Sequence, residues 1–374
     1  MPYRVPFIRP VFPDGSEIAS DFDAIVGSNW YTNFGPKERE FGRAISERIG
    51  GGVRVVTFAN ATLALMAAVQ TLLGRGDGRR LVIVPSFTFA AGPAAIAWAG
   101  YQPRFIDIDD ASLQPSLDSA REVLENSTLD VAGILLCNTF GIGNPEIALW
   151  EGLASEFGLP LIVDSAAGFG SMYTPDAAVG TAGALEVFSF HATKPFAVGE
   201  GGAIATRDEA LAVLLKEFQN FGFHAGMGST MLGLNGKLQE INAAIGLRQL
   251  ARFDSALASR RRVLDVYREG FEETQITMPT NIELSSVCFA SAVLPGQPSR
   301  DQAVEDLLAQ GVEARTYYSP AVHRQPHFLS YASESSLPVT DRIVSRVLSL
   351  PVHEDMPTVV AQQIVRVVRT AVGA

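Results

Sequence analysis

Short apolar segments alternate with helical segments through the first two thirds of the chain, and this alternation limits the possible folds more than any other feature. Each apolar segment is brief and rich in Val, Ile, Leu or Phe, which is typical of buried strands. Strands separated by helices of this length form βαβ units and build a mainly parallel sheet covered on both faces. We expect strands at residues 55–58, 81–84, 104–108, 130–137, 159–164, 185–190 and 203–206, and helices at 62–73, from 85 to about 100, at 117–125 and at 146–157.

The pattern changes after residue 236. Residues 238–271 contain no proline and have the spacing of one long helix, which typically links domains. The chain of 374 residues also exceeds the ~250–300 residues at which a single core stops growing. We therefore expect an α/β chain with a large domain at 1–245, including an N-terminal arm, and a small α+β domain at 246–374. The small domain is expected to contain a strand at 287–294 and helices at 300–310 and 359–372.

The charge balance restricts the partners of the chain. It has 29 Lys and Arg against 40 Asp and Glu, a net charge of −11. Sequence-independent binding to nucleic acid or to an anionic membrane needs a basic surface, so neither partner is expected. One uncharged stretch at 81–103 has the length of a membrane span, but Pro85 and Pro93 interrupt it. It is better interpreted as a strand, a turn and an Ala-rich helix.

The cysteines and histidines predict neither disulfides nor a metal site. Cys137 and Cys288 lie far apart, each in an apolar segment, so they form no disulfide framework or zinc site. A reduced cytoplasm is the expected compartment. His323 and His327 are four residues apart, but nearby prolines disfavour the helix that would bring both to one metal ion.

Three segments carry residues with a shared chemistry. Asp164 ends a predicted parallel strand, where side chains face the ligand crevice. Lys194 lies in an aromatic stretch before the glycines of 199–202, and desolvation there would favour the free amine that forms Schiff bases. Residues 60–62 join a strand to a helix whose N-terminal N–H groups suit a phosphate. A single Asp or helix cap is often only structural. Together, an amine, an acid and a phosphate cradle match the needs of pyridoxal 5′-phosphate (PLP).

Eight blocks of sequence, in this order, resemble the DegT/DnrJ/EryC1/StrS family of PLP-dependent sugar aminotransferases. The resemblance covers most of the chain. It implies the aspartate-aminotransferase-like fold (fold type I), with a mainly parallel seven-stranded sheet in the large domain. The blocks are NFGP at 33–36, NATLAL at 60–65, PSFTF at 85–89, FIDID at 105–109, DSAA at 164–167, SFHATK at 189–194, GEGG at 199–202 and GLNGKLQEINAA at 233–244.

The resemblance also implies roles for single residues. Lys194 is similar to the family's Schiff-base lysine and proton carrier, and Asp164 to the residue that pairs with the pyridine nitrogen. Asn235 matches an Asn that reaches the phosphate from the neighbouring subunit, which implies a homodimer with its active site at the interface. The other expected cofactor-binding residues are Ala61, Thr62 and Ser189 at the phosphate and Phe89 stacked on the ring.

Two positions depart from the family pattern. Ala61 stands where Gly is usual, which should still leave the backbone free to contact phosphate. Ala167 stands where Gln or His is common, so one polar contact with the cofactor is missing or supplied elsewhere. His191 could supply it, or could be an ordinary turn histidine.

The resemblance implies amino transfer from L-glutamate to a nucleotide-linked 4-keto-6-deoxyhexose, with C4 favoured over C3, in an antibiotic or cell-surface sugar pathway. Segment 315–323 resembles the substrate-facing loop, so Tyr317, Tyr318 and His323 are candidate substrate contacts, although aromatics near a Pro turn also pack without function. Lys237 and Arg315 are candidates for the pyrophosphate, or are solvated surface charges.

Three other functions compete with this interpretation. A related sugar 3-dehydratase carries His at the lysine position, and Lys194 argues against it. A non-catalytic PLP-fold regulator could lose Lys194 or Asp164, and both are present. A desulfurase needs a reactive cysteine, and neither cysteine lies in a polar loop.

Overall fold

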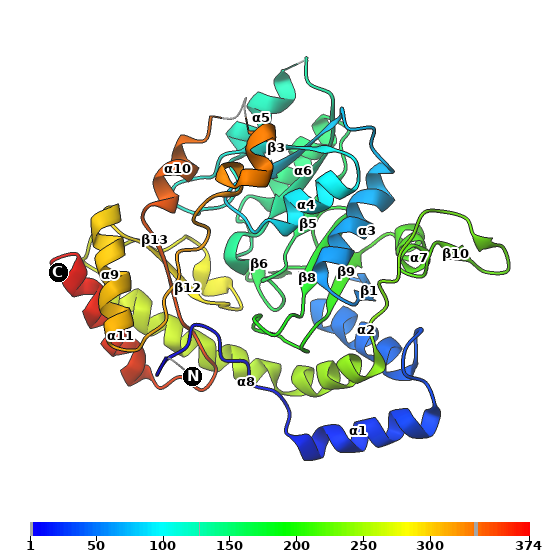
Figure 1. Cartoon of the computed structure of the whole chain (residues 1–374), viewed down its shortest axis with the longest axis horizontal. Coiled ribbons are helices and arrows are strands. Elements are labelled where there is room, and N and C mark those ends of the chain that lie inside the picture. The colour runs from blue at the N-terminus through cyan, green and yellow to red at the C-terminus, as the bar shows by residue number, and fades with distance from the viewer. Residues whose placement is uncertain (1–2, 127, 333–335) are drawn as a thin grey trace.

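The computed structural model describes residues 3–126, 128–332 and 336–374. Its centre is a seven-stranded sheet in which only β9 runs antiparallel to its neighbours (Figure 1). All the expected strands of this sheet are present, so the mainly parallel α/β fold is confirmed. In spatial order the strands are β1 (Arg54–Phe58), β9 (Gly202–Thr206), β8 (Leu185–Ser189), β5 (Leu161–Asp164), β4 (Val131–Cys137), β2 (Leu81–Pro85) and β3 (Gln102–Ile106).

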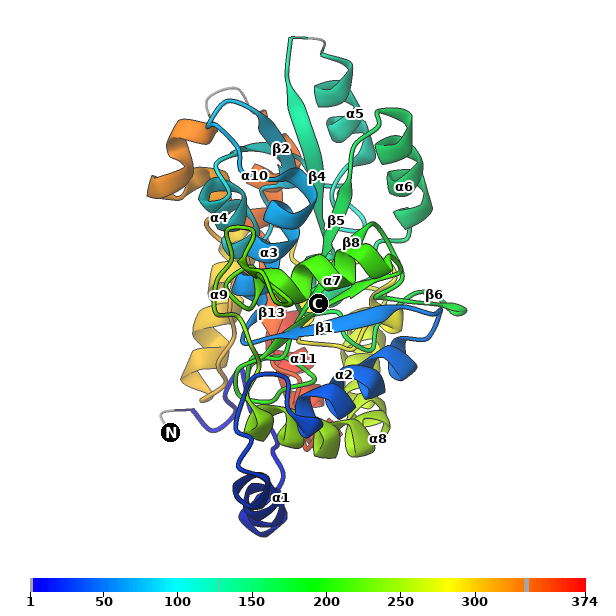
Figure 2. The same cartoon turned by 90° about the vertical axis from the view of Figure 1, so that its right-hand side faces the viewer.

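Helices cover both faces of the sheet, as Figures 1 and 2 show, and each face has its own apolar core. Burial on both faces explains why the strands are continuous apolar runs rather than alternating ones. One face carries α3 (Ala61–Leu73), α4 (Ala91–Trp98) and α7 (Glu209–Phe218). The other carries α2 (Pro36–Ile49), α5 (Leu117–Glu125) and α6 (Ile147–Glu156).

The long helix α8 (Glu240–Phe271) packs in two cores, one on the α2 face of the sheet and one in the C-terminal part of the chain. Phe253 and Leu257 pack in the core beneath the sheet, whereas Val263 and Tyr267 pack in the C-terminal core. The predicted single helix is confirmed. The expected domain division at 245/246 falls within its second turn, and that division stays a prediction.

The C-terminal part packs against the later half of α8. A two-stranded antiparallel sheet and a helical layer form its core, together with Phe7 from the start of the chain. Its elements are β12 (Ala290–Val293), β13 (Val347–Leu350), α9 (Gln297–Ala309), α10 (Pro338–Val344), α11 (Thr358–Ala371) and the 3-10 turn η2 (Ile282–Leu284). The 3-10 turns η3 (Val322–Arg324) and η4 (Pro326–Tyr331) pack instead into the core on the α3 and α4 face of the main sheet.

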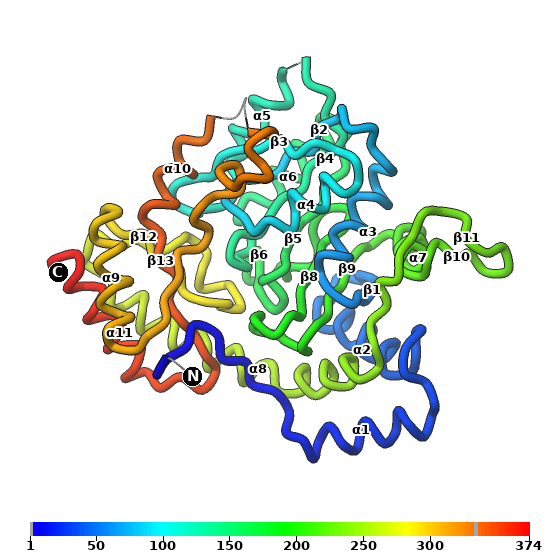
Figure 3. Tube along the Cα trace, viewed as in Figure 1, coloured from blue at the N-terminus to red at the C-terminus, as the bar shows by residue number. Residues whose placement is uncertain are grey.

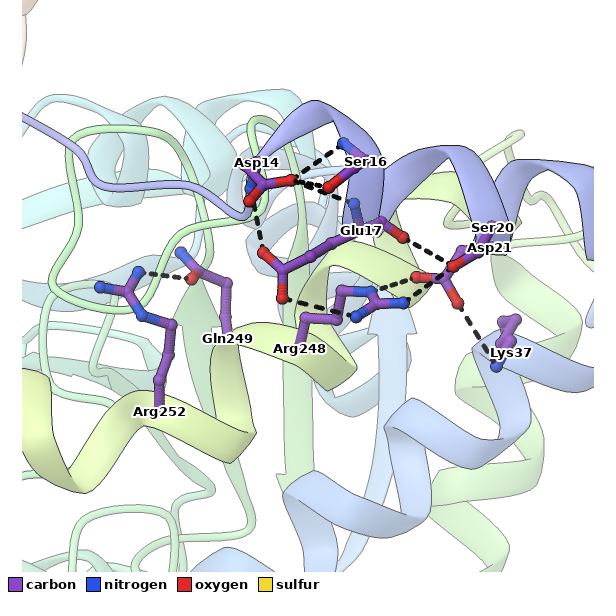
Figure 4. Close-up of polar contacts among 9 residues, drawn as sticks. All are labelled: Asp14, Ser16, Glu17, Ser20, Asp21, Lys37, Arg248, Gln249 and Arg252. Carbon is purple, nitrogen blue, oxygen red and sulfur yellow. Dashed lines mark hydrogen bonds and ion pairs between the residues drawn. The ribbon is translucent and has the colours of Figure 1, made fainter.

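Helix α1 (Gly15–Ser28) was not predicted and is anchored by polar contacts (Figure 4). Arg248 of α8 donates to Asp21 at 2.5 Å and to Ser20 at 3.2 Å, and lies 3.6 Å from Glu17. Asp14 caps the helix by accepting from the backbone N–H groups of its first turn. Ion pairs with α8 and the buried side chain of Ile25 therefore attach α1 to the rest of the molecule.

Two hairpins and a short turn complete the structure. The hairpin of β10 (Phe223–His224) and β11 (Gly228–Ser229) projects from the body of the molecule (Figure 3). The hairpin of β6 (Met172–Thr174) and β7 (Ala177–Ala178) and the 3-10 turn η1 (Thr139–Gly141) follow strands of the main sheet. Within the described residues, no helix is both long and apolar enough to cross a membrane.

Candidate active site

A cavity of about 610 Å³ opens at the carboxyl ends of the parallel strands. Ligands of parallel α/β sheets bind at this edge. Its walls come from the sheet, from the N-terminal segment and from the C-terminal part, so it is assembled from three regions of the chain. Its lining includes Ala61, Thr62, Phe89, Asp164, Ser189 and Lys194 from the region of the sheet, and Phe7, Phe289, Arg315, Tyr317 and Tyr318 from the other two regions.

Asp164 is the last residue of β5 and is 5% exposed. Its Oδ1 accepts from the Ala166 N–H at 3.0 Å, and its Oδ2 accepts no hydrogen bond within the described part of the chain. Burial raises the pKa of this carboxyl to about 6, although the Ala166 N–H and the charge of Lys194 act in the opposite direction. A buried carboxylate with an unused oxygen fits a protonated pyridine nitrogen.

Lys194 follows β8 in a turn held by its own backbone. Its N–H donates to the His191 carbonyl at 2.9 Å, and the Ala192 N–H donates to the Gly199 carbonyl at 2.8 Å. These bonds fix the turn so that the half-buried Lys194 side chain lines the cavity with Asp164. An amine in this wall can reach both a cofactor aldehyde and the substrate bound beside it.

The N-terminus of α3 forms a cradle at the cavity wall. Asn60 caps the helix, its Oδ1 accepting from the Leu63 N–H at 2.9 Å. Within the described residues, the N–H groups of Ala61 and Thr62 have no acceptor and are free for an anion. Gly202 allows the close approach of β9, because a Cβ there would lie 2.8 Å from the Ala61 nitrogen. With the nearby Ser189 hydroxyl, these groups fit the phosphate of PLP.

Phe89 and His191 also line the cavity. Phe89 is 66% exposed, so its ring is available to a bound group, and its stacking role stays a prediction. The Nδ1 of His191 accepts from the Thr193 N–H at 3.2 Å, so the proton of a neutral ring lies on Nε2. That nitrogen is 3.6 Å from Glu200, another lining residue. His191 therefore lies in the cavity wall with its Nε2 beside the Glu200 carboxylate.

Three predicted residues do not line this cavity. His323 is 3% exposed, with Nδ1 2.6 Å from the Ser86 hydroxyl and Nε2 3.1 Å from Asp341. Both ring nitrogens are engaged inside the fold, so the structure does not bring His323 to a substrate. The resemblance of segment 315–323 to the substrate-facing loop suggested His323, but its ring serves this buried hydrogen-bond network.

Lys237 and Asn235 lie at the base of the β10–β11 hairpin instead. Lys237 is 8% exposed, donates to Asn220 Oδ1 at 3.2 Å and lies 4.8 Å from the centre of the Phe221 ring. Asn235 is exposed and pairs with Asn220 through the backbone. Its expected role in a neighbouring subunit stays a prediction.

Several features of the wall were not predicted from the sequence. Cys137 and Cys288 both line the cavity although their sequence surroundings are apolar. Burial raises the pKa of the Cys137 thiol far above its usual range, so this thiol is a poor nucleophile. The N-terminal Phe7 and Ile8 were also missed, since no local pattern predicts a contact with residues three hundred positions away.

A buried carboxylate, Glu186, lies on β8 behind the wall. It accepts from the Ser165 and Tyr173 hydroxyls at 2.5 and 2.7 Å, and from the Gly180 and Ala182 N–H groups at 2.7 and 3.1 Å. Burial raises its pKa to about 7 in spite of these donors. Through Ser165, this network supports the turn that follows Asp164.

Comparisons with known proteins agree with this geometry. Residues 13–369 match the model of the DegT/DnrJ/EryC1/StrS aminotransferase family. Protein Rv3402c of Mycobacterium tuberculosis is 49% identical over 356 residues, covering 94% of this chain and 86% of that protein. The dTDP-4-amino-4,6-dideoxy-D-glucose transaminase of Shigella dysenteriae is 29% identical over 368 residues, covering 96% and 97%.

A solved structure extends the agreement to the fold. DesI, crystallised in the presence of its TDP-sugar product, has a TM-score of 0.88 and 30% identity, covering 97% of this chain and 92% of that one. The fold is therefore that of the fold type I PLP aminotransferases, and the cradle, the acid and the lysine fit their cofactor. The chain belongs to the DegT/DnrJ/EryC1/StrS aminotransferase family and is a PLP-dependent enzyme.

Proposed function

We propose that this enzyme transfers the amino group of L-glutamate to a nucleotide-linked keto-6-deoxy sugar, at C4. The observation that carries the proposal is the placement of Lys194 and the buried Asp164 in one cavity with the α3 cradle. The Shigella relative, named for a dTDP-linked 4-amino sugar, supports both the substrate class and C4. DesI, crystallised with its TDP-sugar product, supports the substrate class. A homodimer with Asn235 reaching the partner's phosphate site belongs to the same proposal.

Each residue of the site has a task in this reaction. PLP, when bound, supplies the aldehyde that exchanges the amino group and a ring that delocalises the electrons left by the departing proton. With PLP bound, the Lys194 Nζ would take the proton from the α-carbon of glutamate and, in the second half of the cycle, would deliver a proton to the sugar carbon. Asp164 would pair with the ring nitrogen, and Ala61, Thr62 and Ser189 would anchor the phosphate.

The test is the visible absorbance of the protein with PLP, before and after addition of L-glutamate. We expect a band that forms with PLP, moves to shorter wavelength with glutamate, and is lost in Lys194→Ala. Lys216→Ala is the matched control, because Lys216 is exposed on α7 and outside the cavity. A panel of nucleotide 4-keto and 3-keto sugars then identifies the acceptor by return of the band.

Two outcomes would contradict the proposal. A band that persists in Lys194→Ala would remove Lys194 from its role. A normal band that glutamate leaves unchanged would exclude glutamate as donor and favour the non-catalytic regulator instead.

A further inference from the structure

The cavity wall contains one arginine. Among the described lining residues, Arg315 and Lys194 are the only Arg or Lys side chains. The inference below rests on the proposed function, in which Lys194 serves the cofactor. Arg315 is then the fixed positive charge that remains for an anionic group of the substrate.

A segment from the start of the chain lies directly against the one that carries Arg315. We call residues 5–8 the N-terminal strap. The Val5 N–H donates to the Gly311 carbonyl at 3.0 Å, and the Glu313 N–H donates to the Val5 carbonyl at 2.9 Å. The Phe7 N–H donates to Glu313 Oε2 at 2.8 Å. The strap and the segment before Arg315 therefore form one hydrogen-bonded unit.

The guanidinium of Arg315 is held on three sides. Its Nε and Nη2 donate to Glu313 Oε1 at 3.0 and 2.7 Å, and its Nη1 donates to the Tyr317 hydroxyl at 2.5 Å. The Phe7 ring lies beneath it, 4.8 Å from the ring centre to Cζ. A guanidinium has five N–H groups. One N–H on Nη1 and one on Nη2 thus remain without an acceptor among the described residues.

We propose that Arg315 binds a pair of anionic oxygens of the substrate, and that Glu313 and the strap are positioning residues that aim its guanidinium into the cavity. The planar fork of an arginine matches a carboxylate or a phosphate bidentately. Two sources supply this chemistry, the carboxylate of the amino donor and the pyrophosphate of the nucleotide sugar. Lys in place of Arg315 would keep the charge but lacks the planar fork that presents two N–H groups to a pair of oxygens while a third N–H faces Glu313.

The direction in which anion affinity changes when the Glu313 charge is removed tests its role. A carboxylate beside an anion site repels the anion, so its removal would tighten binding if charge alone mattered. If Glu313 acts by orienting Arg315, its removal releases the guanidinium and weakens binding. Glu313→Gln therefore separates a positioning role from a purely electrostatic one.

The experiment is calorimetric titration of the PLP-loaded protein with glutarate and, separately, with thymidine diphosphate. Neither probe has a primary amine or a sugar ketone, so binding is measured without turnover. We expect Arg315→Met to weaken one probe roughly 10- to 100-fold, since hydrogen bonds to charged groups contribute that much. Loss of glutarate binding would assign the donor carboxylate, and loss of thymidine diphosphate binding the pyrophosphate. Arg315→Lys should not restore binding, and Glu313→Gln and Phe7→Leu should each weaken the same probe several-fold.

The matched control is Arg342→Met, because Arg342 is a similarly exposed arginine, 2.7 Å from Asp110 and outside the cavity. The PLP band is recorded on every sample. Absence of the band from the unmodified protein would refute the proposed function. An intact band with no binding of either probe, or with affinities that Arg315→Met leaves unchanged, would overturn the assignment of Arg315 alone. Tighter binding in Glu313→Gln would overturn the positioning role.

Discussion

Asp164 and Glu186 are buried carboxyl groups whose pKa values are raised to about 6 and about 7. Desolvation is the largest cause in both, because neither forms an ion pair within the described residues. A folded state that binds protons more tightly than the unfolded chain loses stability as pH rises between the two pKa values. Ionisation of these two carboxyl groups therefore lowers the free energy of unfolding as the pH approaches neutrality.

Glu186 allows this cost to be measured, because it does not line the cavity. Its pKa rises from the ordinary 4.5 to about 7, so its contribution to the free energy of unfolding should fall by about 3 kcal/mol from pH 4.5 to pH 7. Denaturant unfolding of the PLP-free protein as a function of pH tests this. In Glu186→Gln the decline should be shallower. Glu156→Gln is the control, since Glu156 is an exposed carboxylate paired with Arg121. Equal slopes in Glu186→Gln and the unmodified protein would contradict the assignment.

At the scale of single elements, the sequence predicted the helices and strands whose local residue pattern is distinctive. The parallel strands were found because burial on both faces makes them short apolar runs. Helix α1 was missed although Asp14 and Glu17 form a capping box, which is a local helix-start signal. Only its attachment to Arg248 of α8, more than two hundred positions away, lacks a local pattern. At the site, Asp164 and Lys194 were predicted from their chemistry, whereas the orientation of Arg315 depends on Phe7 and Glu313, which are 306 positions apart. Such contacts have no local signature.

The close approach of β9 to α3 yields a prediction about glycine. Gly202→Ala should force the α3 N-terminus away from the sheet, since its Cβ would lie 2.8 Å from the Ala61 nitrogen. We expect a loss of roughly 1–3 kcal/mol of stability and weaker PLP binding, measured by thermal unfolding and by absorbance titration. Gly152→Ala in α6 is the contrasting variant, because nothing lies within 4 Å of a Cβ there. It should stabilise the protein by about 0.5–1 kcal/mol and leave PLP affinity unchanged. If both variants behave alike, packing at Gly202 does not shape the cradle.

At the scale of the whole molecule, α8 joins the core of the sheet to the C-terminal core without a break. We therefore expect the two parts to unfold together. All three tryptophans precede residue 151, so their fluorescence reports on the large domain, while far-ultraviolet circular dichroism reports on both parts. The two signals should give one coincident transition in denaturant. Separate midpoints would mean that the cores are independent despite the shared helix.

The N-terminal strap has a consequence for synthesis of the chain on the ribosome. Glu313, the hydrogen-bond partner of Phe7, is made 306 residues after it. At roughly 5–20 residues per second, that interval is about 15–60 s. During this interval the strap has no segment to pair with, and the apolar Val5 and Phe7 are left without their final packing. The wall of the cavity can therefore close only after translation has passed Arg315.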